Sequence, residues 1–347
     1  MKKRDVALTA AVAGAARGYA ALRARRGAPS RTVLVTGGSR GLGLCIAREY
    51  LARGARVAIC ARDPAELERA KDLLDGDGRP ILAIPCNVAD PAQVAELVAM
   101  VEQHFGYLDT LVNNAGVIQV GPVEHMTADD YRAALYAHLF APLYLTEAVL
   151  PGMRARRRGR IVNVSSIAGL LPLPHMLPYT ASKFALAGWS QGLRAELAGT
   201  GIRVTTVCPA LIRTGSARNA EFKGRHRAEY AWFSISDSLP LLSINAGRAA
   251  RRIVRAAEHG QARLVMPAYV RVPVALYGLW PGLVSWALSA ADRLLPEPDG
   301  AGAEGRLGRE STSAWSPSWL TALDERAARA NNEEIGPFAP TRPDPLR

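Results

Sequence analysis

The chain has 347 residues, of which 49% are hydrophobic, and 43 Lys plus Arg against 31 Asp plus Glu give it a formal net charge of +12. A chain of this length can bury a sizeable core in one large domain or two smaller ones, without metals or disulfides. The composition excludes collagen-like, low-complexity and wholly disordered proteins. The positive charge at first suggests a nucleic acid or an anionic membrane surface as partner.

The positive charge is concentrated in two segments. Residues 1–31 contain eight basic residues and one acidic residue, and residues 151–160 contain five arginines and no acid. The rest of the chain is therefore balanced in charge. Two separate patches do not form the continuous basic stripe of a nucleic-acid-binding surface, so we expect no nucleic-acid partner.

The four cysteines are Cys45, Cys60, Cys86 and Cys208. None of them stands at metal-ligand spacing from another Cys or a His, so no metal site is expected. Free cysteines commonly pack as small hydrophobic residues. Reduced, buried thiols indicate a reducing compartment, which favours the cytoplasm.

Two segments outside the main body leave alternatives open. Residues 1–30 are a basic, alanine-rich leader that suits an interfacial helix, a solvated leader or a cleaved signal peptide. Residues 271–295 include the uncharged stretch Val272–Ala291, which is long enough to span a membrane. Prolines and glycines interrupt this stretch, so two short helices are predicted. They suit packing as a core element or lid, association with a membrane surface, or a membrane span.

Residues 296–347 are expected to form a flexible tail with one short helix. Residues 296–312 are rich in Gly, Pro and charged side chains, a composition typical of linkers. Residues 316–334 follow a helical pattern, with Ser316 or Ser318 as the candidate N-cap.

The body, residues 31–270, alternates apolar strands with helices. Strands are expected at 32–36, 56–60, 81–85, 110–114, 160–166, 203–209 and 262–266. Helices are expected at 44–53, 63–74, 91–105, 127–151 and 178–199, with Asp63 and Asp90 as N-caps. This alternation predicts an α/β fold, a doubly wound parallel sheet of the Rossmann type. Such sheets bind ligands at the carboxyl ends of their strands.

A glycine-rich turn follows the first predicted strand and opens the first helix. Its sequence is Thr36-Gly37-Gly38-Ser39-Arg40-Gly41-Leu42-Gly43. Glycines allow a tight turn and a close approach of the backbone to a pyrophosphate, and the helix start favours the negative charge. An acidic residue after the second strand would favour NAD, but Arg62 stands there. Because Arg pairs well with phosphate, Arg62 and Arg40 favour NADP.

Tyr179 and Lys183 are spaced to share one face of a predicted helix. A nearby ammonium should lower the pKa of the tyrosine, which could then exchange a proton with a carbonyl oxygen. Ser166 ends a predicted strand thirteen residues before Tyr179, where its hydroxyl could bind a substrate oxygen. Asn113 and Asn114 end another strand at the same edge.

Together the motifs TGGSRGLG, NNAG, VNVSS and YTASK strongly resemble the short-chain dehydrogenase/reductase family, over about residues 30–270. The resemblance implies an oxidoreductase in which Tyr179 is the acid/base, Lys183 tunes it and holds the nicotinamide ribose, and Ser166 orients the substrate. It also implies a homo-oligomer. The remaining residues that it implies for cofactor binding are Gly37, Ser39, Arg40, Gly41, Gly43, Arg62 and Asn114.

Three positions of this sequence depart from the family pattern. Asn87 stands where an Asp near the adenine is usual, and an amide can still bind there. Ala210 replaces the glycine of a Pro-Gly turn, with Thr214 placed to reach the carboxamide. His138 replaces an Asn that holds a water of the proton relay. The histidine could relay a proton itself or simply pack in the core, and the sequence does not decide between the two.

The variable segment after Thr214 concentrates aromatic residues, which suit either an apolar substrate or ordinary helix packing. They are Phe222, Tyr230, Trp232 and Phe233. We therefore expect NADP(H)-dependent interconversion of a lipophilic ketone or aldehyde and its alcohol, with peripheral membrane contact as an open alternative. The competing hypothesis is a catalytically weak NADP-binding regulatory or scaffold protein on the same fold.

Overall fold

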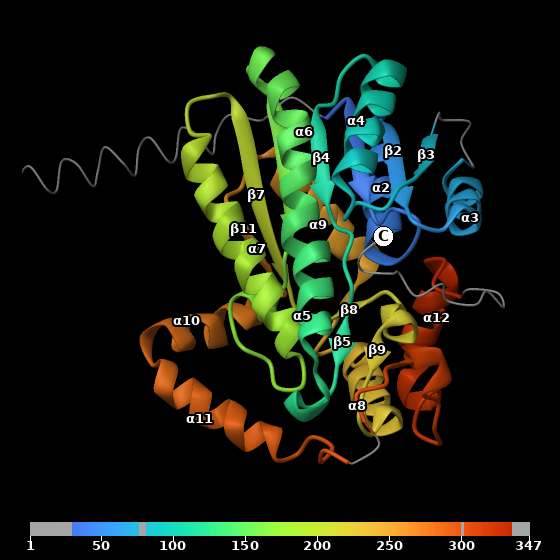
Figure 1. Cartoon of the computed structure of the whole chain (residues 1–347), viewed down its shortest axis with the longest axis vertical. Coiled ribbons are helices and arrows are strands. Elements are labelled where there is room, and N and C mark those ends of the chain that lie inside the picture. The colour runs from blue at the N-terminus through green and yellow to red at the C-terminus, as the bar shows by residue number, and fades with distance from the viewer. Residues whose placement is uncertain (1–29, 76–80, 300–301, 335–347) are drawn as a thin grey trace, which may run out of the picture.

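The computed structural model of the chain describes residues 30–75, 81–299 and 302–334, so the leader, apart from Ser30, lies outside the described residues. Its centre is a seven-stranded parallel sheet in the order β3-β2-β1-β4-β6-β7-β11 (Figure 1). The strands are β1 (Thr32–Thr36), β2 (Arg56–Ala61), β3 (Ile81–Pro85), β4 (Thr110–Asn113), β6 (Gly159–Val164), β7 (Ile202–Pro209) and β11 (Arg263–Met266). The strand order reverses between β1 and β4, which confirms the predicted doubly wound fold.

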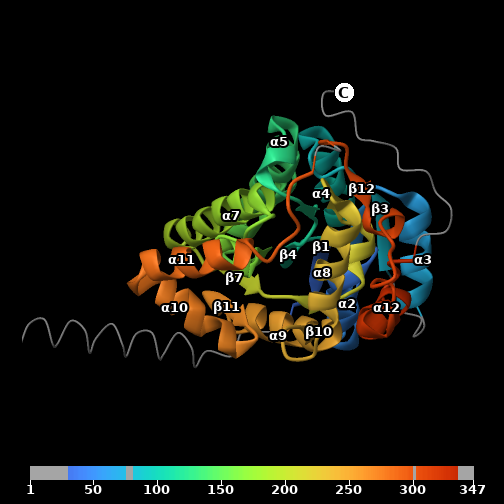
Figure 2. The same cartoon turned by 90° about the horizontal axis from the view of Figure 1, so that it is seen from below.

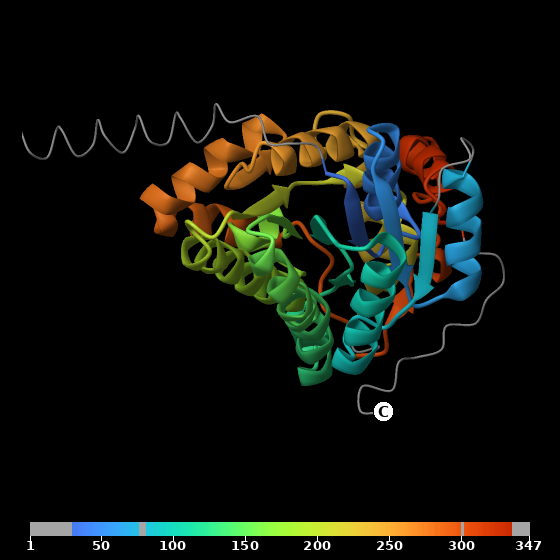
Figure 3. The same ribbon diagram turned by 90° about the horizontal axis from the view of Figure 1, so that it is seen from above.

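Helices cover both faces of this sheet, as the view in Figure 3 shows. One layer consists of α2 (Gly41–Ala52), α3 (Pro64–Leu74) and α9 (Ala246–Glu258), and the other of α4 (Pro91–Phe105), α6 (Ala141–Ala155) and α7 (Leu177–Glu196). Strands β1, β4 and β6 are buried along their whole length. Two covered faces explain why the strand sequences are continuously apolar rather than alternating.

The local signals for helix starts work as predicted. Asp63 Oδ1 accepts hydrogen bonds from the backbone N–H groups of Ala65 and Glu66, and Asp90 caps α4 in the same way. The long helix predicted at 127–151 is divided by a π-turn, Tyr136–Phe140, into α5 (Ala128–Leu135) and α6. The sequence analysis did not predict α9, whose apolar face is made largely of alanines.

The second basic segment lies at the amino edge of the sheet. Arg158 pairs with Asp109, just before β4, at 3.3 Å, and Arg156 donates to the carbonyl of Leu108 at 3.1 Å. This edge is opposite the carboxyl ends where ligands bind in such folds, so these arginines are remote from the predicted site.

The uncharged stretch near residue 280 forms two short helices, as predicted, α10 (Arg271–Leu279) and α11 (Pro281–Asp292). The chain bends by 119° between them, and they project from the body without burying a single residue (Figure 2). Only as one bent pair do they have the length to cross a membrane. Among the described residues, the run Ala128–Ala155 also has that length and composition, but it packs against α4 and α7.

The tail differs from its prediction, because residues 302–334 pack against the carboxyl edge of the sheet. A short strand, β12 (Arg306–Leu307), pairs antiparallel with β9 (Glu221–Phe222). The predicted short helix is present as α12 (Ala322–Ala330) and lies beside α8 (His226–Ser238) (Figure 1). Some polar side chains of the tail make buried hydrogen bonds to the body, including Asp324 to the Gly215 N–H and Asn332 to the Ser39 carbonyl.

Candidate active site

The residues predicted to carry the chemistry follow four neighbouring strands at one edge of the sheet. The glycine turn follows β1, Asn114 follows β4, Ser166 follows β6 and Pro209 ends β7. Tyr179 lies in the first turn of α7, which begins at Leu177. The parallel topology thus assembles side chains from distant parts of the sequence, as expected of such sheets.

Ser166, Tyr179 and Lys183 form one cluster. Tyr179 and Ser166 share a side-chain hydrogen bond. The Ser166 hydroxyl also accepts a hydrogen bond from the backbone N–H of Ala168 at 3.1 Å, which fixes its position. The Lys183 ammonium lies 5.4 Å from the centre of the Tyr179 ring and donates to the Val164 carbonyl at 3.0 Å.

Burial controls the protonation of this cluster. It raises the pKa of Tyr179 to about 12, although the hydrogen bond from Ser166 opposes the rise and the nearby Asp237 adds to it. Burial lowers the pKa of Lys183 to about 7. From the sequence, Lys183 was expected to lower the pKa of Tyr179. The structure gives the opposite direction because removal from water outweighs other influences on the phenol.

His138 lies in the π-turn and is fully engaged by its neighbours. Its Nε2 accepts a hydrogen bond from the backbone N–H of Val117 at 3.1 Å, so Nδ1 carries the proton and faces the Ser182 hydroxyl at 2.8 Å. Burial, together with the charge of Lys183, holds the pKa of His138 well below its usual range. Its ring meets that of Tyr179 edge-on at 5.4 Å. This geometry favours the packed alternative, in which His138 positions its neighbours.

The glycine turn has the backbone that the sequence predicts. Gly37 and Gly41 have φ angles of +61° and +57°, which favour glycine. A Cβ on Gly43 would overlap the carbonyl oxygen of Gly37, so α2 can begin this close to the turn only with glycine there. Asn114 donates to the carbonyl oxygens of Thr36 and Gly37 at 3.0 and 3.2 Å, which ties the end of β4 to the turn.

Arg40 and Arg62, expected to favour NADP, lie close enough for their charges to interact. Burial of the Arg62 guanidinium and the charge of Arg40 both lower the pKa of Arg62. Arg40 pairs with Glu66 at 2.8 Å and with Glu333 at 3.4 Å. Their charges raise the pKa of Arg40 despite its burial. Ser39 also hydrogen-bonds Glu66. The sequence analysis did not include these carboxylates in the site.

The two remaining cofactor positions make local bonds. Asn87 follows β3, and its side-chain oxygen accepts from the backbone N–H of Ala89 at 3.2 Å. Thr214 is buried, and its hydroxyl accepts from the backbone N–H of Ser216 at 3.1 Å. All four cysteines are free and buried, as predicted. The described residues contain no group of three or more His, Cys, Asp or Glu arranged to hold a metal.

Residues 31–223 match a family model described as short chain dehydrogenase. The chain belongs to this family. It is therefore an oxidoreductase of a family that binds a nicotinamide dinucleotide, NAD or NADP, and acts on small molecules.

Curated relatives of this short-chain dehydrogenase match about half of the chain. The putative ketoacyl reductase 1 of granaticin polyketide synthase from Streptomyces violaceoruber is 40% identical over 186 residues, which cover 53% of this chain and 68% of that protein. Dehydrogenase/reductase SDR family member 7B from Rattus norvegicus is 38% identical over 194 residues, covering 54% of this chain and 60% of the rat protein.

Solved structures agree with the fold. A short-chain dehydrogenase from Streptomyces avermitilis superposes with a TM-score of 0.64 and 31% identity, covering 76% of this chain and 97% of that one. A variant of the actinorhodin polyketide ketoreductase, solved with NADPH, gives a TM-score of 0.62 and 29% identity, with coverages of 70% and 97%.

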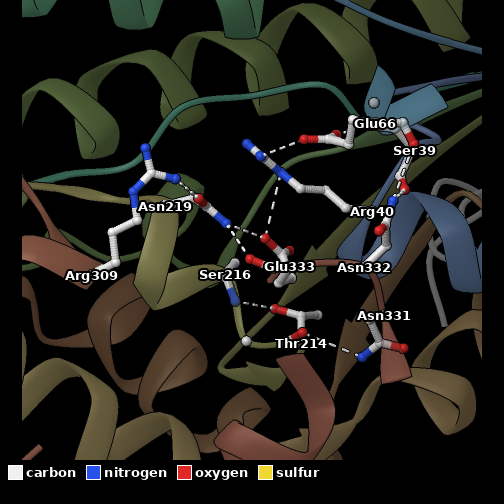
Figure 4. A network of polar contacts seen from close by, with 12 residues as sticks. Ser39, Arg40, Glu66, Thr214, Ser216, Asn219, Arg309, Asn331, Asn332 and Glu333 are labelled. Atoms are coloured by element: carbon white, nitrogen blue, oxygen red, sulfur yellow. Dashed lines mark hydrogen bonds and ion pairs between the residues drawn. The ribbon is translucent and has the colours of Figure 1, made fainter. Parts of the chain in front are cut away.

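In this short-chain dehydrogenase the C-terminal residues Asn331, Asn332 and Glu333 also belong to the site (Figure 4). All three are buried against the glycine turn and the segment after β7. Asn332 contacts Ser39, which is 293 positions earlier in the chain. No local pattern could have predicted these contacts, because residues so far apart are brought together only by the complete fold.

Most of the aromatic residues after Thr214 pack in the protein interior. Phe222, Tyr230 and Phe233 are buried in a small cluster formed with Val120 and its neighbours. Trp232 and Tyr179 are only partly buried and border this same cluster. Packing in the interior therefore accounts for three of the four aromatic residues, and Trp232 is the one that stays partly exposed.

Proposed function

We propose that the protein is an NADP(H)-dependent oxidoreductase that interconverts a lipophilic ketone or aldehyde and its alcohol. The observation that carries this proposal is the cluster of Ser166, Tyr179 and Lys183 at the carboxyl edge, on the same side as a glycine turn at a helix start. The positive φ angles of Gly37 and Gly41 fit the tight turn that holds a pyrophosphate. When bound, the nicotinamide supplies or accepts the hydride.

Tyr179, Ser166 and Lys183 have different roles in the transfer of the proton. In reduction, Tyr179 donates its phenolic proton to the carbonyl oxygen, and Ser166 hydrogen-bonds the same oxygen as it gains negative charge. A pKa raised to about 12 keeps the phenol protonated near neutral pH, which suits a proton donor. Lys183, with a pKa of about 7, holds a proton that can be passed back towards the phenol.

NADP rather than NAD is favoured by the two arginines near the end of β2. Arg40 and Arg62 can both pair with a 2′-phosphate, whereas the usual acidic partner of an NAD ribose is replaced by Arg62. Glu66, which pairs with Arg40, would have to give up this contact. Replacement of Arg62 by Ala should therefore weaken the binding of NADPH more than the binding of NADH. Equal losses of affinity for the two cofactors would contradict the preference for NADP.

A lipophilic substrate is supported by what surrounds Tyr179. Its ring borders the apolar cluster that includes Leu173, Met176 and Trp232. The relatives named as ketoacyl or polyketide reductases point to ketones on extended carbon chains. The test is NADPH oxidation by the purified protein with ketones and aldehydes of rising chain length, with sugars as the comparison. Turnover of sugars but of no lipophilic carbonyl would overturn the proposal.

Tyr179→Phe distinguishes catalysis from the scaffold alternative. The change removes the transferable proton but keeps the ring, so turnover should fall by about 100-fold or more while NADPH binding is retained. If the wild-type protein binds NADPH, yet no carbonyl on the panel is reduced and Tyr179→Phe changes nothing, the scaffold alternative is favoured.

Peripheral membrane contact is supported by α10 and α11, whose large apolar side chains face water. Trp286, Leu279, Leu283 and Trp280 are 71%, 68%, 58% and 57% exposed. Their helices carry no charge between Val272 and Ala291. Helices of this kind can lie in a membrane interface. We expect flotation with anionic vesicles, and its loss in Trp280→Ser/Trp286→Ser. A second copy of the chain covering these helices would instead produce a dimer without lipid.

A further inference from the structure

Asn331, Asn332 and Glu333 lie close to Ser39 and Arg40 of the glycine turn (Figure 4). The backbone N–H of Gly41, the first residue of α2, donates to the carbonyl of Asn331 at 2.8 Å. The Asn332 amide donates to the carbonyls of Ser39 and Glu66 at 2.9 and 3.1 Å. The Gly41 N–H is one of the donors that a helix start leaves free, so the Asn331 carbonyl satisfies a group that a ligand would otherwise bind, and the two bonds of Asn332 hold the segment in place.

Glu333 places a carboxylate at the start of this helix. Its side chain is 3% exposed and accepts from the Asn219 amide at 2.7 Å. One of its oxygens lies 2.5 Å from the position that a Cβ on Gly41 would take, and Thr214 lines the same space. The absence of a side chain on Gly41 is what allows a phosphate to approach the backbone, and here a carboxylate fills that room. Burial raises the pKa of Glu333 to about 7, against the charge of Arg40 and the hydrogen bond from Asn219, so this side chain is ionised in part of the molecules near neutral pH. In its ionised form it is an anion at a helix start beside Arg40, which is the chemistry of phosphate binding.

The preceding helix holds this segment in place. The Asp324 carboxylate accepts a hydrogen bond from the Gly215 N–H at 2.9 Å, next to Thr214. A Cβ on Gly215, whose φ is +88°, would overlap Ala328 of α12, so the two backbones pack closely. The contact therefore involves a packed helix and three consecutive residues rather than one surface ion pair.

We propose that the segment 319–334 is a built-in competitor of the dinucleotide, which docks Glu333 where a cofactor phosphate would bind. The inference rests on the cofactor site of the proposed function. The cofactor then binds only after the segment leaves, so its apparent affinity is lowered by the fraction of molecules with an open site. Docking also engages Arg40, one of the two cations proposed for the 2′-phosphate.

A disulfide can lock the docked state. The Cys45 Sγ lies 3.2 Å from the side-chain oxygen of Asn331, so Asn331→Cys brings two thiols together. In the full chain, oxidation of this variant should form the cross-link, counted by mass spectrometry, and NADPH binding followed by its fluorescence should fall by at least about 100-fold. Reduction should restore binding. Saturating NADP⁺ added before the oxidant should slow the cross-link. Cys45→Ser/Asn331→Cys is the control that cannot form it.

A second variant should release the segment from the site without replacing any of the proposed cofactor residues. Asn332→Asp keeps the shape but turns a buried donor into a charged acceptor facing two carbonyl oxygens. Loss of these bonds should tighten NADPH binding about tenfold or more. The matched control is Asn245→Asp at the exposed start of α9, where either residue caps the helix, and its NADPH affinity should not change.

The outcomes separate this inference from the proposed function. If NADPH binds the wild type and the cross-linked protein equally, or if the cross-link does not form, the inference is wrong and the cofactor proposal stands. Weaker binding by Asn332→Asp, with a cross-link that NADP⁺ accelerates, would overturn it in favour of a segment that closes over the cofactor. If no variant binds NADPH or NADH, both proposals fail.

Discussion

Replacement of His138 by Ala tests whether this residue positions the site or carries a proton. The ring is 1% exposed, and both its nitrogens are bonded, to the Val117 N–H at 3.1 Å and the Ser182 hydroxyl at 2.8 Å. Loss of an acceptor for a largely buried N–H costs about 1–3 kcal/mol, and the cavity left by a ring costs about 2–3 kcal/mol more. We therefore expect the free energy of unfolding to fall by about 3–6 kcal/mol.

The measurement is urea unfolding together with the pH dependence of turnover. His138→Gln is the matched variant, because a Gln amide can reach the position of Nε2 and accept from the Val117 N–H. It should recover most of the lost stability and keep kcat within about threefold. The pH profile should be unchanged, since burial already holds the pKa of His138 well below its usual range.

A proton relay through His138 predicts a different result. Neither Gln nor Ala can carry a proton as imidazole does, so both variants would lose turnover to a similar degree. If His138→Gln is as stable as the wild type but loses as much kcat as His138→Ala, the positioning role is refuted. A limb of the pH profile that disappears in both variants would identify the imidazole as the titrating group.

Three further predictions concern buried charge and close packing. Lys223→Met should lower the free energy of unfolding by about 3–5 kcal/mol, because it leaves the buried Asp130 carboxylate without its ion-pair partner. Arg132→Met removes one partner of an exposed ion pair and should lower it by less than about 1 kcal/mol. Urea unfolding measures both. Gly43→Ala should abolish NADPH binding in a fluorescence titration, because its Cβ overlaps the turn. Since the Lys183 pKa falls from 10.5 to about 7 on folding, the unfolded chain binds more protons between these values, so stability rises with pH. The wild type should gain about 2 kcal/mol relative to Lys183→Met between pH 7 and 9, and a constant difference would contradict the lowered pKa.

Residues whose roles follow from local pattern and sheet topology could be predicted from the sequence. For the helix Pro91–Phe105, the Asp90 cap, the spacing of apolar residues and both boundaries can be predicted from the local sequence alone. Ser166 and Asn114 could be placed at one edge because the strands of a parallel sheet end there, whereas the role of Tyr179 came from its spacing to Lys183 and from the family resemblance. Helix α9 was missed although its sequence carries a clear amphipathic signal, with buried alanines, Ile253 and Val254 on one face and arginines on the other.

Protonation states could not be predicted in the same way. The spacing of Tyr179 and Lys183 correctly placed an ammonium near a phenol, at 5.4 Å from the ring. Spacing does not show how completely neighbours from α5, β6 and the loops exclude water. Burial dominates the pKa of both groups and reverses the direction expected for the tyrosine.

The cofactor site shows why a motif alone gives an incomplete account of charge. The glycine turn and the end of β2 contribute only cations to the prediction, Arg40 and Arg62. In the folded chain Glu66 reaches Arg40 from 26 positions away, and Glu333 reaches it from the C-terminal segment. Any 2′-phosphate must compete with these carboxylates for the same guanidinium. In the binding mode that we propose, cofactor preference and affinity are set jointly by the turn and by a segment predicted from the sequence to be a flexible tail, and the displacement of Glu333 is part of the energetic cost of binding.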